Sequence, residues 1–506
     1  MKRLLPLLLL GAAPVPGVDL LIRGGQVFTG DGPVFIGDVA VGGDRIVAVG
    51  SRLAVRARRT IDARGLIVAP GFIDPHTHME GALASADAAE RLVPAFLLQG
   101  VTTAFIGNDG GGSPDVAAVL ARAAKAPVGV NHAAYVGFGA VRQAVIGAAA
   151  RAPSADELAR MRAMVARAMC DGAMGLSTGL FYAPQSFATT DEVVALAREA
   201  GTRGGFYDSH LRDESSYTVG LRAAVAEALT IGRAARIPVH ISHIKALGVD
   251  VEGQSGAVIA QVRAARAAGQ KVTADQYPWS ASGTSLVAAL VPGPAQDGGR
   301  AAMLGRLDDG QVRAGMAENL RRRGGAAKLL ITEGSEKGRT LAQVAGAGGP
   351  IAAAIAIIRR ADPAVASFNQ SERDIRAFMA QPWVMTGSDA STGHPRVYGS
   401  FARKWAVYVR AGVLSPRQFV ERSSTLAADT FGLVGRGHLR VGSFADVVVL
   451  DPKTYAARAT YAQPTLTAAG VQTVVVNGVV AVDRGRLTGA AAGRALPHAP
   501  PPGTCR

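Results

Sequence analysis

The stretch GFIDPHTH, residues 71–78, is the most informative segment of this 506-residue chain for its fold. A short apolar segment leads directly into two histidines, His76 and His78, which are two residues apart and therefore point to the same side of an extended strand. Two imidazoles on one face can share a cation. In a parallel α/β barrel the active site gathers at the carboxyl ends of the strands, so this segment is typical of a first barrel strand.

Seven further segments repeat this pattern of a short apolar run with polar residues at its end. They alternate with Ala-, Arg- and Glu-rich stretches that predict helices, one of which opens on Ser154 with Glu157 in the capping-box position. Eight strand–helix units in series predict an α/β fold of the (β/α)8 TIM-like barrel type. The seven segments are VTTAFIGND (101–109), VGVNHAAYV (128–136), GAMGLSTG (172–179), GGFYDSH (204–210), PVHISHI (238–244), KVTADQYP (271–278) and PWVMTGSD (382–389).

The two ends of the chain follow a different pattern. Short runs of alternating apolar residues separated by Gly-containing turns predict small β layers at both ends, which together form a β-sandwich. Within the barrel, a Gly- and Pro-rich stretch with a helical part interrupts the rhythm and is a candidate lid. The Pro-rich tail is expected to be disordered. The predicted boundaries are 18–70 and 436–495 for the sandwich, 71–435 for the barrel, 286–349 for the insertion and 496–506 for the tail.

Composition excludes several classes of protein. With 48% hydrophobic and 18% charged residues, the chain is neither disordered nor a coiled coil. Its two cysteines, Cys170 and Cys505, are too few for a disulfide framework or a thiolate zinc cluster. The net charge of +15 comes from interspersed arginines, and with 5% aromatic residues it matches no nucleic-acid-binding module.

The first seventeen residues, MKRLLPLLLLGAAPVPG, predict a secretory signal. A basic start, an apolar run and a small-residue exit near Ala13 are its three parts. Pro14, Pro16 and Asp19 interrupt the run well before the roughly 20 apolar residues that a membrane helix needs. The sequence therefore predicts export to the periplasm or the medium, with no membrane span.

Other strand ends supply further metal ligands. His210, His243 and Asp389 close three of the predicted strands, so they are expected at the same barrel mouth as His76 and His78. A single His-x-His pair is equally compatible with a structural role, but four imidazoles and a carboxylate converging on one mouth suit zinc in an open, hydrolytic site.

These features resemble the amidohydrolase superfamily and, within it, the D-aminoacylase (N-acyl-D-amino-acid deacylase) group, from about residue 19 to residue 494. The resemblance implies a distorted (β/α)8 barrel beside a small β-sandwich. It also implies one metal position at His76 and His78 and another at His210 and His243. The matching pieces are APGFIDPHTH, GVTTAFIGNDG, GLSTGLFYAP, SHLRDE, ISHIK, TADQYPW, TGSDAS, GHPRVYGSF, GSFADVVVLDP and VVVNG.

Asp109 departs from that family pattern. The familiar members carry a metal-binding Cys at this place, whereas a carboxylate can bridge two divalent ions and changes the preference away from the softest metals. We expect Asp109 to be a ligand, and the alternative is an Asx turn in a Gly-rich loop. Ser177 stands where other amidohydrolases carry a carboxylated lysine, so a carbamate bridge is not expected. One or two Zn²⁺ ions, or other divalent metals, are the predicted cofactors.

Asp389 has the clearest catalytic duty. A carboxylate beside the metal and the attacking water can accept the water proton and pass it to the leaving amine. The alternative is a ligand or helix-capping role without proton transfer.

The resemblance also implies that Lys245, Tyr277 and Arg396 hold the carboxylate of an N-acyl-D-amino acid, a task that suits a cation, a hydroxyl and a guanidinium. The predicted function is a metal-dependent amide hydrolase that deacylates N-acyl-D-amino acids. Two alternatives are a dipeptidase that cleaves peptides with a C-terminal D-residue and a non-catalytic binding protein of the same fold.

Overall fold

The predicted strands form the wall of a parallel barrel in the computed structural model, which describes residues 17–505. One run of neighbours is β6-β7-β8 and the other is β9-β10-β11-β12-β13-β17, and a bridge between Thr77 and Ala390 joins β17 to β6. β8 and β9 are two halves of one interrupted strand, so the barrel has eight positions and confirms the predicted fold class. The strands are β6 (Phe72–Asp74), β7 (Val101–Ile106), β8 (Asn131–Ala134), β9 (Val136–Gly137), β10 (Gly175–Gly179), β11 (Phe206–His210), β12 (Val239–Ile241), β13 (Val272–Gln276) and β17 (Val384–Thr386).

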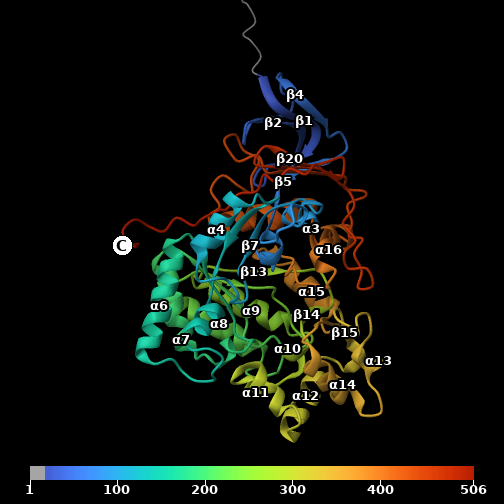
Figure 1. Cartoon of the computed structure of the whole chain (residues 1–506). Coiled ribbons are helices and arrows are strands. Elements are labelled where there is room, and N and C mark those ends of the chain that lie inside the picture. Colours follow the sequence, from blue (N-terminus) through green and yellow to red (C-terminus); the bar gives the residue numbers. More distant parts are fainter. Residues whose placement is uncertain (1–16, 506) are drawn as a thin grey trace, which may run out of the picture.

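Amphipathic helices cover the outside of this barrel, so that their apolar faces and the strands share one core (Figure 1). The Ser154 hydroxyl accepts from the Glu157 backbone N–H, and the Glu157 carboxylate accepts from that of Ser154, which confirms the predicted capping box. No helix within residues 17–505 is long and apolar enough to cross a membrane. The main covering helices are α4 (Val116–Lys125), α5 (Phe138–Val145), α6 (Ala155–Cys170), α7 (Thr190–Thr202), α8 (Leu221–Ala235), α9 (Ser255–Ala267), α15 (Glu372–Met379) and α16 (Arg396–Arg403).

Both ends of the chain build one β-rich domain at the top of Figure 1. Its nine strands follow the order β21-β20-β19-β18-β5-β1-β2-β3, with β4 paired to β1, so β5 and β18 join the N-terminal and C-terminal parts. Alternating residues such as Leu20, Ile22, Val447 and Val449 form its buried face. The strands are β1 (Gly17–Val27), β2 (Phe35–Gly42), β3 (Arg45–Gly50), β4 (Arg56–Asp62), β5 (Ile67–Pro70), β18 (Val447–Leu450), β19 (Val471–Val476), β20 (Val479–Asp483) and β21 (Arg486–Leu487). The predicted signal segment, residues 1–17, lies outside the described residues except for Gly17.

The C-terminal tail is ordered, contrary to the expectation of disorder. The backbone N–H of His132 donates to Arg494, and that of Leu496 donates back to His132, so the tail pairs with the interrupted third barrel strand. A disulfide between Cys170 and Cys505, 335 residues apart, then fixes the tail to the end of α6. The disulfide could not be predicted from the composition, because a single pair of distant cysteines has no spacing pattern. Only the folded chain brings the two cysteines together.

Residues 282–367 form a separate unit beside the barrel mouth, called the inserted subdomain below. Its three-stranded sheet has the order β14-β16-β15, and its helices enclose a hydrophobic core of their own that includes Leu286, Met316 and Ile358. The predicted insertion, 286–349, lies within it. The elements are β14 (Ser282–Ser285), α10 (Leu286–Leu290), α11 (Gly299–Arg306), α12 (Gly310–Arg322), β15 (Leu329–Ile331), α13 (Leu341–Val344), α14 (Gly349–Arg360) and β16 (Ala364–Ser367).

Candidate metal centre

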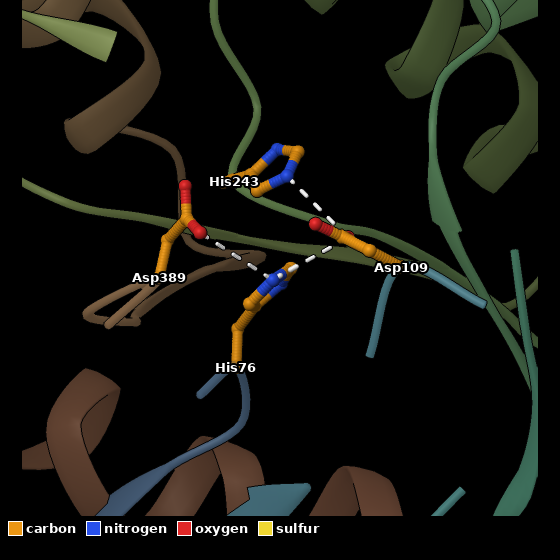
Figure 2. A group of neighbouring side chains, drawn as sticks. All are labelled: His76, Asp109, His243 and Asp389. Carbon is orange, nitrogen blue, oxygen red and sulfur yellow. Dashed lines mark ion pairs between the residues drawn. The ribbon is translucent and has the colours of Figure 1, made fainter. Parts of the chain in front are cut away.

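The strand ends bring the six predicted metal ligands together at one mouth of the barrel. His76 and His78 follow β6, Asp109 follows β7, His210 ends β11, His243 follows β12 and Asp389 follows β17. Figure 2 shows four of them, His76, Asp109, His243 and Asp389, with their side chains directed at one another. The sequence predicted the four histidines and Asp389 at this mouth from their places at strand ends, and Asp109 from its place in the family pattern.

The carboxylate of Asp109 lies at the centre of this group. Its Oδ1 is 3.4 Å from Nε2 of His76 and 3.6 Å from Nε2 of His243. Its Oδ2 is 3.5 Å from Nε2 of His78 and 3.6 Å from Nδ1 of His210. Each oxygen therefore faces one imidazole from each predicted histidine pair, so the carboxylate points into the group of histidines and does not form an Asx turn with its own loop.

The backbone is strained at three of these residues. Asp109, His243 and Asp389 have φ values of 55°, 35° and 47°, in the left-handed region that L-residues rarely adopt. Such strain costs on the order of 1–3 kcal/mol per residue and persists where the surrounding structure fixes it, as happens at functional sites. All three residues lie within three positions of the end of a barrel strand.

Opposite charges control the ionisation of the centre. Burial lowers the pKa of His78, but the carboxylates of Asp109 and Asp389 outweigh it and raise that pKa to about 9. Burial likewise opposes ionisation of Asp109, yet His76, His243 and His210 hold its pKa well below the usual range. The carboxylates likewise raise the pKa values of His76 and His243, whereas burial lowers that of His210.

The residues fit a divalent cation. Separations of 3.4–3.6 Å between nitrogen and oxygen are too long for good hydrogen bonds. They match two ligands that are each ~2.1 Å from one tetrahedral ion, because such ligands lie roughly 3.4 Å apart. In addition, Nε2 of His76, Nδ1 of His210 and Oδ1 of Asp109 are buried and have no hydrogen-bond partner within residues 17–505.

Two further carboxylates face the histidine ring nitrogens that point away from Asp109. The sequence did not assign these two acids a firm role. Glu214 places Oε1 3.2 Å from Nδ1 of His243 and Oε2 3.6 Å from Nε2 of His210. Asp275 lies beneath the centre, with Oδ2 3.7 Å from Nδ1 of His76. Such partners orient metal-binding imidazoles and raise their basicity. In the sequence, Glu214 could have been found from its place four residues after His210 in SHLRDE. Asp275 could have been found because an acid within a buried barrel strand has no packing role.

The predicted substrate residues lie beside this centre. Nη1 of Arg396 is 2.7 Å from Oδ2 of Asp389, and Nζ of Lys245 is 2.7 Å from Oε1 of Glu214. Tyr277 is fully buried, and its ring lies 4.8 Å from the Arg396 guanidinium carbon and 5.7 Å from Nζ of Lys245. Its hydroxyl accepts from Nε2 of Gln370 at 3.0 Å. The two cations thus face the cavity while Tyr277 supports them from behind.

One carboxylate oxygen of Asp389 faces the histidines and the other is paired with a guanidinium. Its Oδ1 is 3.4 Å from Nε2 of His78 and its Oδ2 contacts Arg396. Burial favours the neutral acid, but Arg396 and His243 outweigh burial and hold the pKa of Asp389 far below its ordinary value. Asp389 is therefore ionised in this arrangement.

A cavity of about 430 Å³ opens onto the centre, a size suited to a small molecule. One wall consists of barrel residues, among them Phe181 and Tyr182, whose rings pack 5.8 Å and 4.8 Å from that of His210. Other lining residues come from the inserted subdomain and include Arg323, which the sequence did not single out. His394 also lines the cavity, whereas His240 bonds Asp275 inside the barrel.

Comparison with known proteins agrees with this geometry. The profile of the amidohydrolase family matches residues 59–482. A D-aminoacylase of Alcaligenes xylosoxydans xylosoxydans is 35% identical over 94% of this chain and 97% of its own length. A solved D-aminoacylase with a binuclear metal centre is 33% identical, with a TM-score of 0.81 over 95% of this chain and 100% of that one. An N-acyl-D-glutamate deacylase of Bordetella bronchiseptica, complexed with zinc and a phosphonate inhibitor, is 32% identical, with a TM-score of 0.81 and the same coverage.

Proposed function

Because the chain belongs to the amidohydrolase family, we propose that it is a metal-dependent hydrolase that removes the acyl group from N-acyl-D-amino acids. The observation that carries the proposal is the Asp109 carboxylate surrounded by four imidazoles, with Asp389 and two cations around the same cavity. The relatives of known activity named above are deacylases, covered over nearly their whole length.

We propose that the cation is Zn²⁺, in one or two copies. His76, His78, Asp109, His210, His243 and Asp389 would hold it, a set of imidazole and carboxylate ligands that suits zinc. When bound, the ion polarises the amide carbonyl and makes water more acidic. The oxygen ligand Asp109 also suits harder divalent ions, so other metals are expected to support some activity.

Asp389 would serve as the general base and then as the general acid. Its ionised carboxylate accepts a proton from the attacking water at Oδ1, the oxygen directed at the histidines. The same oxygen then gives the proton to the nitrogen of the leaving D-amino acid. Arg396 keeps Asp389 ionised beforehand and is close enough to share its remaining N–H groups with a substrate carboxylate.

Lys245 and Arg396 would hold that carboxylate, with Tyr277 positioning them. Both cations line the cavity beside the candidate metal centre. There they can reach the carboxylate of a substrate whose amide bond lies at that centre. The named relatives are deacylases and give no support to a dipeptidase or a non-catalytic binding protein.

We also propose that the protein is exported to the periplasm or the medium. The N-terminal sequence has the three parts of a secretory signal. The Cys170–Cys505 disulfide supports the same proposal, because disulfides persist mainly in oxidising compartments. Mass spectrometry of protein recovered from its native host checks it, and an intact Met1 would contradict it.

The experiment that tests the main proposal is hydrolysis by the zinc-loaded protein of N-acetyl-D-amino acids, the matching L-isomers and L-Xaa-D-Xaa dipeptides. We expect release of free D-amino acid from the first set, at rates far above those for the other two. Faster cleavage of the dipeptides would favour the dipeptidase alternative, and no cleavage by a metal-loaded protein would favour the binding protein.

A further inference from the structure

Gln185 carries a buried amide that contacts the backbone of the central residue of the metal centre. It begins a single 3-10 turn, Gln185–Phe187, in the loop that follows β10, and it is only 6% exposed. Its Nε2 donates to the Asp109 carbonyl at 2.9 Å, and its Oε1 accepts from the Gly179 backbone N–H at 2.7 Å. The amide thus connects the end of β10 to the loop that carries Asp109.

Three glycines leave room for this arrangement. A Cβ atom added to Gly139, which belongs to α5, would lie only 2.6 Å from Cδ of Gln185. One added to Gly110 would overlap the same amide, and one added to Gly179 would overlap the Asp109 carbonyl. Real Cβ atoms do not approach other atoms so closely, so any larger residue at these positions would displace the amide or the carbonyl. Packing therefore fixes the amide in addition to its hydrogen bonds.

Asp109 depends on such contacts because its own loop does not fix its conformation. Its φ of 55° lies in the left-handed region that L-residues rarely adopt. Gly107 and Gly110, on either side, also have positive φ values, and glycine restricts the backbone less than any other residue. The direction of the Asp109 carboxylate is therefore set by groups outside the loop.

Ser177 and Gln185 share this task. The Ser177 hydroxyl donates to the Gly107 carbonyl and accepts from the Gly110 N–H at 3.1 Å, so it holds the two ends of the loop. Gln185 holds the residue between them, through the carbonyl of Asp109. Rotation of that peptide group would move the Asp109 Cα and turn its carboxylate away from the imidazoles.

We infer that Gln185 is a positioning residue of the metal centre: its amide fixes the backbone of Asp109, so that the carboxylate is directed at the bound cation. This inference rests on the metal-dependent function proposed above. Gln185 itself does not line the cavity formed by the described residues, 17–505, so its role lies in metal binding and not in substrate binding.

The first test measures the affinity for zinc, which does not depend on catalysis. Gln185→Ala removes both hydrogen bonds of the amide and leaves all six candidate ligands in place. We expect the zinc dissociation constant, measured by competition with a chelator, to rise by at least about tenfold, as is typical when a group that orients a metal ligand is lost. Gln143→Ala removes an exposed amide from α5 and should leave this constant unchanged. A wild-type constant in Gln185→Ala would overturn the inference.

The absorption spectrum of the cobalt-loaded protein distinguishes positioning from folding. The d–d bands of Co²⁺ depend on its coordination geometry, so a displaced Asp109 carboxylate should change them in Gln185→Ala at full cobalt occupancy. The metal-free variant should keep the circular dichroism of the metal-free wild type. A lower thermal midpoint combined with wild-type zinc affinity and cobalt bands would make Gln185 a structural residue only.

A second variant displaces the amide without removing it. Gly139→Ala suits a helix, and its new Cβ would push against the Gln185 side chain. We expect it to raise the zinc dissociation constant about threefold or more in the wild type and to have no further effect in Gln185→Ala, where the space is free. Equal effects in both backgrounds would contradict the inference, because the two changes would then act independently.

Failure of this inference can be told apart from failure of the proposed function. A wild type that binds neither zinc nor cobalt would refute the metal-dependent function, and this inference with it. A wild type that binds zinc but cleaves no N-acyl-D-amino acid would refute the proposed substrate class, while the zinc affinities of the variants would still support or overturn the role of Gln185.

Discussion

The two walls of the cavity have different origins, the barrel mouth on one side and the inserted subdomain on the other. Barrel residues at the wall stand at strand ends, where a parallel barrel collects its reactive groups whatever their chemistry. Residues of the inserted subdomain are held by a separate hydrophobic core and reach the cavity from a helix end and two short strands.

This difference suggests a division of labour. Groups at the barrel mouth contact one another at fixed distances, so losing one disturbs the whole metal centre. Polar groups of the inserted subdomain at the cavity make their hydrogen bonds mainly to other residues of that subdomain. Changing one of them should therefore alter which substrate is accepted and leave the metal centre in place. The predictions below test that division, beginning with the largest expected effect.

Replacing His243 should abolish metal binding and activity together. Its Nε2 faces Asp109 and its Nδ1 faces Glu214, so His243→Ala removes a ligand from a site that has few to spare. We expect loss of the tightly bound ion by metal analysis and no measurable deacylation. His438→Ala, a change of the same kind outside the cavity, should keep both. Unchanged metal content in His243→Ala would refute the assignment.

Replacing Asp389 should separate catalysis from metal binding. Asp389→Asn keeps the shape of the side chain and an oxygen for the cation but cannot accept the water proton. We expect kcat to fall on the order of a hundredfold or more, with most of the metal retained. The exposed Asp308→Asn serves as a control. Near-normal turnover would mean that another group is the base.

Replacing Arg396 should affect charged substrates more than neutral ones. In Arg396→Ala, kcat/KM for an N-acetyl-D-amino acid should fall more than for its α-carboxamide, by an additional factor of about 30 or more, since a desolvated charge pair is worth about 2–5 kcal/mol. Lys245→Ala should act in the same direction. Equal losses on acid and amide would place the carboxylate elsewhere and weaken the D-amino-acid proposal.

Replacing Glu333 should have the smallest effect. Glu333→Gln removes a half-buried negative charge from the rim of the inserted subdomain, and rim charges act mainly on the rate of encounter. We expect KM for a substrate with two carboxylates to fall by no more than about threefold, with kcat unchanged, and the effect to vanish in high salt. A large fall in kcat would show that the inserted subdomain takes part in the chemistry.

Much of the barrel side could be predicted from the sequence, for a definite physical reason. Strand periodicity is local, and a parallel barrel converts the end of each strand into a position at one mouth, so strand pattern alone predicts that His76, His210 and His243 lie together. The central position of Asp109 was less certain, because a Gly-rich loop gives no periodicity. Its left-handed backbone and the four imidazoles around it depend on packing from four different strands.

The sequence by itself therefore determined the barrel, the joining of both chain ends in one β-rich domain and the residues expected at the metal centre. Which arginines form ion pairs and which do not depends on the tertiary structure. Arg321, Arg322 and Arg323 are adjacent and chemically identical, and only the fold turns the third into the cavity while its neighbours meet acids at the surface. The same holds for Cys170 and Cys505, 335 residues apart. Periodicity reports which face of an element is buried, but a pairing between distant side chains is set by how whole elements pack.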